Sequence, residues 1–185
     1  MSRNALWEQR YRQHSAAEMA KEFETPSRPL FRYRAAIAGM LPSNPGMSVA
    51  EIGAGSGFIA RVICERVGPE GRVFANELEP SMVAYMASRA RAEGLANFTA
   101  VQGTLTSAGL SPSALDAIVI ADAFSCFERP DEMVRSIAEA LKPAGMLVIV
   151  DLPQEGQGPT ATGVDADDVV TAARRAGSSA STKYR

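Results

Sequence analysis

The feature that most constrains the fold of this sequence is an alternation of short apolar segments with longer segments of helical spacing, between residues 47 and 176. The apolar run Ala-Ile-Val-Ile at 117–120 suits a strand that is buried on both faces. Because parallel strands need crossover helices, the economical fold is a parallel sheet with helices on both faces and right-handed crossovers. We therefore predict a doubly wound, mostly parallel α/β sheet. Its strands are expected at 47–52, 72–76, 98–101, 114–120 and 146–150.

The segments between these strands carry the signals of helices. Apolar residues recur on one side of 58–67. Pro80 and Pro130 each open a further helix, since proline is favoured at the first helical position. Asp165 can cap a last helix that reaches Ala176.

The segment before the first expected strand is polar, basic and rich in aromatic residues. Residues 1–34 hold seven Lys or Arg against four Asp or Glu. We expect one or two helical turns within 1–24 and a break at 25–27. Ser27 can cap a second helix, in which apolar residues recur at helical spacing as far as Leu41.

Composition excludes several classes of protein. A net charge of −2 does not favour a phosphate backbone as a partner, so we expect no nucleic acid. Cys64 and Cys126 alone make neither a disulfide framework nor a zinc site, so we expect no metal. The N-terminus lacks the apolar core of a signal peptide, and no apolar run is long enough to span a bilayer. We therefore expect a cytoplasmic setting and no membrane partner.

The loop 53–57, Gly-Ala-Gly-Ser-Gly, is the strongest candidate for ligand binding. In open parallel sheets ligands bind beyond the carboxyl ends of the strands, where the strand order reverses. The loop follows the first expected strand and precedes a helix, and its glycines let backbone N–H groups approach a ligand. Glu77 ends the next strand, twenty residues after Gly57, where a carboxylate can accept both hydroxyls of a ribose. The alternative for Glu77 is a solvated charge at a strand end.

A nicotinamide dinucleotide is another ligand that such a layout can hold. The glycine spacing here is Gly-x-Gly-x-Gly, whereas the dinucleotide fingerprint is Gly-x-Gly-x-x-Gly. Nearly fifty residues precede the first expected strand, and dinucleotide-binding domains often begin close to theirs. Both observations count against a dinucleotide.

Four segments, in order, resemble the motifs of class I S-adenosylmethionine-dependent methyltransferases. They correspond to the family's first motif, its second motif, its fourth-strand motif and the start of its fifth strand. In the last of these, Ala144 stands in place of a glycine. The resemblance covers about residues 30–176. It implies a Rossmann-like fold, S-adenosylmethionine as the cofactor and S-adenosylhomocysteine as its product. The matching segments are 49–57, 73–77, 115–120 and 140–151.

The resemblance also implies where the cofactor lies. The glycine loop would surround its methionine part with Glu51 behind the loop, and Glu77 would bind the ribose. Thr104 stands where the family often has an acidic residue for the adenine amino group, and Asp122 could face the sulfonium end. The implied cofactor-binding residues are Glu51, Gly53, Ala54, Gly55, Gly57, Glu77, Leu78, Thr104, Leu105 and Asp122.

Two departures from the family stand after the fourth and the fifth strands. The segment 121–127 has no histidine, although the subfamily often has one there. The family usually closes its sheet with a strand hairpin after the last helix, but only 177–185 follow the expected helix here. We therefore expect that hairpin to be shortened or missing, and a second subunit of a homodimer could cover the open edge.

These inferences predict one methyltransferase domain that acts on a small-molecule acceptor. Residues 1–45 would form a helical lid or extension, 46–151 the cofactor-binding core, and 152–185 a C-terminal helix and short tail. The aromatic residues of the lid, and His14, could line the acceptor site, and its basic character could attract an anionic acceptor. The lid residues meant are Trp7, Tyr11, His14 and Tyr33.

The catalytic group is the least determined part of this prediction. Methyl transfer needs mainly positioning and water exclusion, and only an alcohol or phenol acceptor gains from a base. His14, the only histidine, and Asp122 are the candidates, although a lone histidine in a polar helix is more often solvated. The alternative function is a catalytically weak or inactive nucleotide-binding module or subunit.

Overall fold

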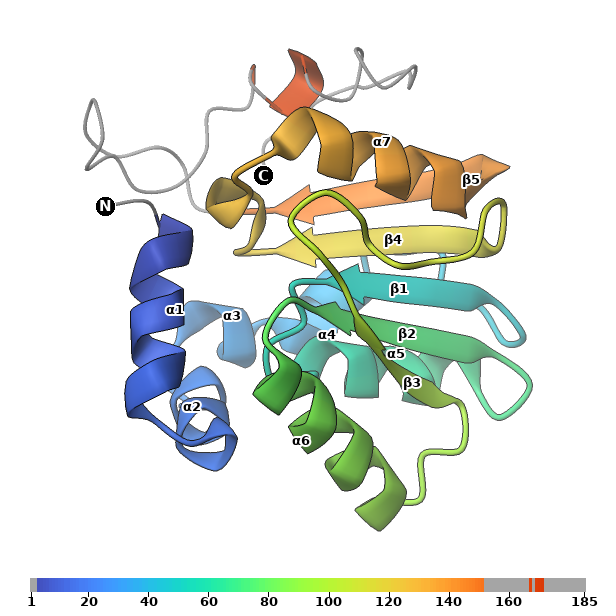
Figure 1. The fold of residues 1–185 in the computed structure, drawn as a ribbon. Coiled ribbons are helices and arrows are strands. Elements are labelled where there is room, and N and C mark those ends of the chain that lie inside the picture. The colour runs from blue at the N-terminus through green and yellow to red at the C-terminus, as the bar shows by residue number, and fades with distance from the viewer. Residues whose placement is uncertain (1–2, 152–166, 168, 172–185) are drawn as a thin grey trace.

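The computed structural model describes residues 3–151, 167 and 169–171, and its body is a five-stranded parallel sheet (Figure 1). The strand order is β3-β2-β1-β4-β5, and every neighbouring pair is parallel. The order reverses between β1 and β4, so the crevice that such sheets use for ligands lies at the carboxyl ends of these strands. The strands are β1 (Ser48–Ile52), β2 (Arg72–Glu77), β3 (Phe98–Gln102), β4 (Leu115–Ala121) and β5 (Leu141–Val150).

Both faces of the sheet are buried, as the apolar run at 117–120 predicts. Ala117 and Val119 belong to the core on one face, whereas Ile118 and Ile120 belong to the core on the other, and all four are 0% exposed. Helices α4 (Arg34–Ala38), α5 (Phe58–Val67) and α6 (Pro80–Ala92) pack into the first core, and α7 (Pro130–Ala140) packs into the second. The predicted doubly wound α/β fold is therefore confirmed.

Before β1 the chain forms helices α1 (Arg3–Gln13), α2 (Ala16–Phe23), α3 (Pro29–Arg32) and α4. The expectation of only one or two turns within 1–24 is wrong. Ser15 and Glu18 form a capping box at the start of α2: the Ser15 hydroxyl accepts from the N–H of Glu18, and the Glu18 carboxylate accepts from the N–H of Ser15. Figure 1 shows α1 and α2 beside the carboxyl ends of the strands.

The helix expected from Ser27 to Leu41 is wrong in its start and in its continuity. Arg28 rather than Ser27 is the N-cap of α3, because Pro29 takes the first helical position, which its fixed φ favours. Tyr33 leaves helical geometry at φ −97° and ψ 11°, so α3 and α4 are separate short helices.

Strand β5 begins at Leu141, earlier than the expected 146–150. Leu115 pairs with Leu141 and Ala117 pairs with Met146, so the segment expected as a turn is an irregularity within the strand. The Lys142 ammonium nitrogen lies 2.7 Å from a carboxylate oxygen of Asp116 in β4, which holds this part of β5 against its neighbour.

The C-terminal helix expected from Asp165 and the shortened hairpin fall mostly outside the described residues. Residues 167 and 169–171 are described, and they are helical. Across the described part of the chain, none of the helices combines the length and the apolar character that crossing a membrane requires.

Candidate functional site

A cavity of about 480 Å³ lies at the carboxyl ends of the strands, where the sequence analysis places the site. Its walls come from the β1–α5 loop, the end of β2, the β3–β4 loop and the end of β4, and α1 supplies a further wall. The volume is within the range of small-molecule sites. All of the expected cofactor-binding residues except Gly57 line this cavity.

The glycine loop is shaped by both its backbone and its packing. Gly53 and Gly55 have φ of 73° and 55°, in the left-handed region that side chains disfavour. A Cβ on Gly53 would lie 2.5 Å from the Cβ of Ala123, and a Cβ on Gly55 would lie 3.2 Å from the Phe23 ring. Gly57 does not line the cavity, and it is instead the N-cap of α5.

Glu51 lies behind the loop, as expected, and it completes the cap of α5. Gly57 has no side chain to cap the helix, and the Glu51 carboxylate accepts from the N–H of Ala60 at 2.8 Å instead. Burial raises the pKa of Glu51 to about 8, although the Ala60 hydrogen bond opposes this rise and nearby Glu77 adds to it. Glu51 therefore links β1, the loop and the first turn of α5.

Glu77 is 7% exposed and is held by three backbone donors. One carboxylate oxygen accepts from Gly55 at 2.8 Å, and the other accepts from Leu78 at 2.7 Å and from Glu79 at 3.3 Å. Burial raises its pKa, and the three N–H groups partly offset that rise. The solvated strand-end charge considered as an alternative is thus not what the structure contains.

This geometry fits an adenosyl ligand. The Glu77 carboxylate is fixed by backbone at the cavity wall, and the oxygen that accepts only from Gly55 keeps an acceptor position for a ribose hydroxyl. Glycine at 53 and 55 avoids the close contacts that a side chain would make with Ala123 and Phe23, which also line the cavity. The fit rests on this chain's own donors, acceptors and loop shape.

Thr104 and Leu105 line the cavity in the β3–β4 loop, but the Thr104 hydroxyl is engaged in its own turn. It accepts from the N–H of Thr106 at 3.3 Å and from that of Ser107 at 3.0 Å. Asn76 on β2 fastens the same loop, since its side-chain amide donates to the Ala108 carbonyl at 2.7 Å. Asn76 also lines the cavity, and sequence reasoning missed it.

Asp122 follows β4 in a left-handed conformation, with φ of 54°. Its N–H donates to the Val150 carbonyl at 2.8 Å, and its carboxylate accepts from the Arg28 guanidinium at 2.9 Å. Arg28 also lines the cavity, and sequence reasoning missed it. Ninety-four positions separate the pair, so no local pattern could reveal it.

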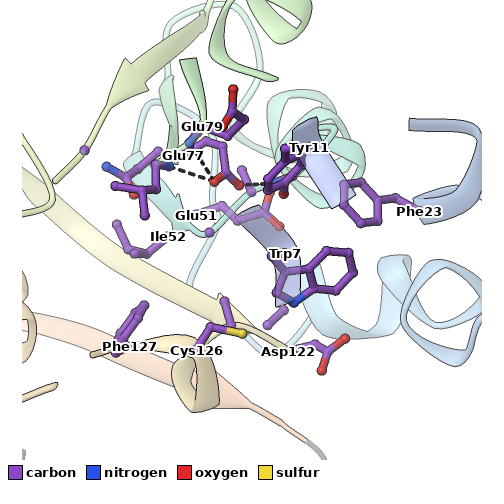
Figure 2. A pocket seen from close by; sticks show the side chains of 18 of the residues that line it. Trp7, Tyr11, Phe23, Glu51, Ile52, Glu77, Glu79, Asp122, Cys126 and Phe127 are labelled. Atoms are coloured by element: carbon purple, nitrogen blue, oxygen red, sulfur yellow. Dashed lines mark hydrogen bonds between the residues drawn. The ribbon is translucent and has the colours of Figure 1, made fainter. Parts of the chain in front are cut away.

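Helix α1 brings Trp7, Glu8, Tyr11 and Arg12 to the cavity. Figure 2 shows Trp7 and Tyr11 projecting between Glu77 and Asp122. The Trp7 ring centroid lies 5.5 Å from that of Phe23. Burial, and then the charges of Glu77 and Glu79, raise the pKa of Tyr11 well above its ordinary value, so its hydroxyl stays protonated.

The other residues expected at the acceptor site are placed differently. Tyr33 is 56% exposed and does not line the cavity. His14 does not line it either, and lies with Leu6 in a separate hollow on the surface of α1. Half-buried Cys126 does line the cavity, from the short 3-10 helix η1 (Phe124–Cys126).

Comparison with known proteins shows which family this chain is similar to. Residues 43–173 match a family model described as "Methyltransferase domain". A protein-L-isoaspartate O-methyltransferase of Methanopyrus kandleri is 34% identical over 116 residues, which are 62% of this chain and 49% of that protein. A ubiquinone/menaquinone biosynthesis C-methyltransferase of Bordetella parapertussis is 27% identical over 119 residues, 64% of this chain and 46% of that protein. The chain therefore spans about half the length of these curated relatives.

A solved structure extends the comparison to the fold. The crystal structure of a SAM dependent methyltransferase from Aquifex aeolicus matches with a TM-score of 0.71, over 89% of this chain and 88% of that one. The two sequences are 21% identical, so this likeness concerns the fold alone.

Proposed function

The chain belongs to the methyltransferase domain family, and on this premise we propose that it transfers a methyl group from S-adenosylmethionine to a small-molecule acceptor. The observation that carries the proposal is a cavity in which the glycine loop and Glu77 face aromatic side chains of α1. When bound, the cofactor supplies a methyl group on a positively charged sulfur; the acceptor's lone pair bonds to that methyl, and the sulfur keeps the electrons of the broken bond and becomes neutral.

Each wall of the cavity has a role in this proposal. Glu77 accepts the ribose hydroxyls, and the loop residues Gly53, Ala54 and Gly55 lie against the methionine part. Leu78 and Leu105, beside the turn of Thr104, bound the base end. Asp122 stands at the sulfonium end, and Glu51 and Gly57 support the loop from behind.

The position of α1 supports a small acceptor. Trp7 and Tyr11 place aromatic surface over the carboxyl ends of the strands, and such surfaces line small-molecule sites. A helix over the cavity excludes water from the methyl donor, and water exclusion and orientation are what this chemistry needs. We accordingly propose one domain, with residues 1–45 as a helical lid or extension, 46–151 as the cofactor-binding core, and 152–185 as a C-terminal helix and short tail.

The test combines binding with turnover. Calorimetry on the whole chain should detect binding of S-adenosylmethionine and S-adenosylhomocysteine, and a panel of small amines, phenols, thiols and carboxylic acids should include a methylated acceptor. Binding without any turnover, on small molecules or on peptides, would favour the inactive module. Turnover on a peptide alone would overturn the small-molecule acceptor, and a preference for a nicotinamide dinucleotide would overturn the cofactor.

A further inference from the structure

The ion pair between Arg28 and Asp122 joins the N-terminal segment to the end of β4 inside the cavity wall. The two atoms that pair lie 2.9 Å apart, and the side chains are 24% and 18% exposed. The guanidinium also lies over the Phe23 ring, 5.2 Å from its centroid. A cation that is partly buried and stacked in this way is held in place rather than solvated.

The strand order fixes which end of a bound cofactor this pair would meet. The order β3-β2-β1-β4 places the Thr104 loop, Glu77, the glycine loop and Asp122 in that sequence along the cavity. If Glu77 holds the ribose, the base must lie toward β3 and the sulfur toward β1 and β4. Asp122 and Arg28, which are both partly buried, are then the charged pair at the sulfur.

We propose that Arg28 is a positioning residue that neutralises Asp122 and so sets the preference between the charged methyl donor and its neutral product. The inference rests on the proposed function. An unpaired carboxylate beside the sulfonium would stabilise the donor more than the transition state, in which the positive charge is being lost. Pairing with Arg28 removes this extra stabilisation of the donor. It also lets the neutral product occupy the site without a buried, unbalanced carboxylate.

The experiment measures the ratio of two dissociation constants by calorimetry, that of S-adenosylhomocysteine divided by that of S-adenosylmethionine. Arg28→Gln removes one positive charge from the site, and the ratio should rise about tenfold. Asp122→Asn removes one negative charge from the site, and the ratio should fall about tenfold. The double variant R28Q/D122N has the same net charge as the unchanged chain, and its ratio should return to within about threefold of that chain's value.

Arg28→Lys is the matched control, because it keeps the charge and alters the stacking on Phe23. Its ratio should stay close to that of the unchanged chain, and thermal unfolding should show every variant folded at the temperature of measurement. A purely structural role would weaken both ligands together and leave the ratio unmoved.

The outcomes separate this inference from the proposed function. If the unchanged chain binds neither ligand, the proposed function and the role of Arg28 are both overturned. If it binds both ligands but the two single variants leave the ratio within twofold, or move it in the same direction, only the role of Arg28 is overturned. A double variant that fails to restore the ratio would also overturn it. If Arg28→Gln does not fold, the opposite sign expected for Asp122→Asn still decides.

Discussion

Helices α1 and α2 stand side by side before β1, yet they serve the molecule differently. In α2, Met19 is 0% exposed, Ala20 is 2% exposed and Phe23 is 5% exposed, and all three belong to the core. In α1, no residue whose burial is described is buried, although Trp7 and Tyr11 pack against the core from its edge. The same two residues line the cavity.

The ion pairs of the two helices differ in the same way. Glu24, the C-cap of α2, accepts from Arg61 at 3.0 Å and from Arg89 at 2.6 Å, and its side chain is 15% exposed. Both arginines also pair with Glu93, which closes a ring between α2, α5 and α6. Helix α1 is tied to α2 by Arg10 and Glu22, whose side chains are 40% and 46% exposed.

The comparison teaches that the N-terminal extension is not one unit. Helix α2 belongs to the core, and the lid of our proposal is α1 alone. A truncation that removes both helices would therefore confuse loss of the fold with loss of the lid.

The largest expected effect comes from two truncations. Removing residues 1–24 should unfold the chain, because it deletes buried Met19 and Phe23 and the ring carboxylate of Glu24. Removing residues 1–13 should leave the fold intact and cofactor binding within about tenfold, while turnover falls by about 100-fold or more as orientation and water exclusion are lost. Circular dichroism, calorimetry and a turnover assay measure the three quantities. Normal turnover without residues 1–13 would refute the lid.

Single substitutions should reproduce this contrast on a smaller scale. Met19→Ala should lower the free energy of unfolding by about 2–5 kcal/mol, the range for emptying a buried methionine site. Trp7→Ala is the matched change on α1, and it should lower stability by only about 1 kcal/mol, mainly through its ring contact with Phe23. Urea unfolding measures both. Equal losses of stability would remove the distinction between the helices.

Glu77→Ala tests whether the cofactor site belongs to the body rather than to α1. It should weaken S-adenosylmethionine binding by roughly 1.5–3 kcal/mol, the range for lost hydrogen bonds to a charged group. Because its backbone partners are Gly55, Leu78 and Glu79, the same loss is expected without residues 1–13. Glu70→Ala, in the exposed turn before β2, is the control and should bind normally. Unchanged affinity in Glu77→Ala would reject the ribose role.

The body of the fold could be predicted because its signals are local. Apolar runs, prolines at 80 and 130 and the glycine loop each act on neighbouring residues, and the strands lie close to where they are expected. The register irregularity of β5 was missed, since it depends on pairing with Leu115 in another strand.

The N-terminal region was predicted less well than the sheet, and only part of the difference has a physical cause. Ser15 and Glu18 were a readable capping signal that the sequence analysis overlooked. Arg28 and Glu24, in contrast, take their roles from Asp122 and Arg89, which are 94 and 65 positions away. Side-chain pairs at such separations follow from the fold and cannot be read before it. This is why the glycine loop could be expected at the cavity while Arg28, the partner of Asp122, could not.

The smallest expected effect is on stability at acidic pH. It compares the ion pairs of Glu24, at the end of α2, with the pair of Arg10 and Glu22 between α1 and α2. Burial raises the pKa of Glu24, but the hydrogen bonds from Arg89 and the charge of Arg61 outweigh it, so the pKa is lowered overall. A carboxylate with a lowered pKa stabilises the fold above its unfolded value of 4.5, and that contribution is lost as pH falls through the folded value. Between about pH 5 and pH 3, the unchanged chain should therefore lose about 1 kcal/mol more stability than Glu24→Gln, after allowance for solvent screening. Glu22→Gln removes the exposed pair with Arg10 and should leave the acid slope unchanged, because surface pairs contribute little. Urea unfolding at several pH values measures how the free energy of unfolding changes with pH. If Glu24→Gln and the unchanged chain show the same change, the ring of ion pairs around Glu24 does not anchor α2.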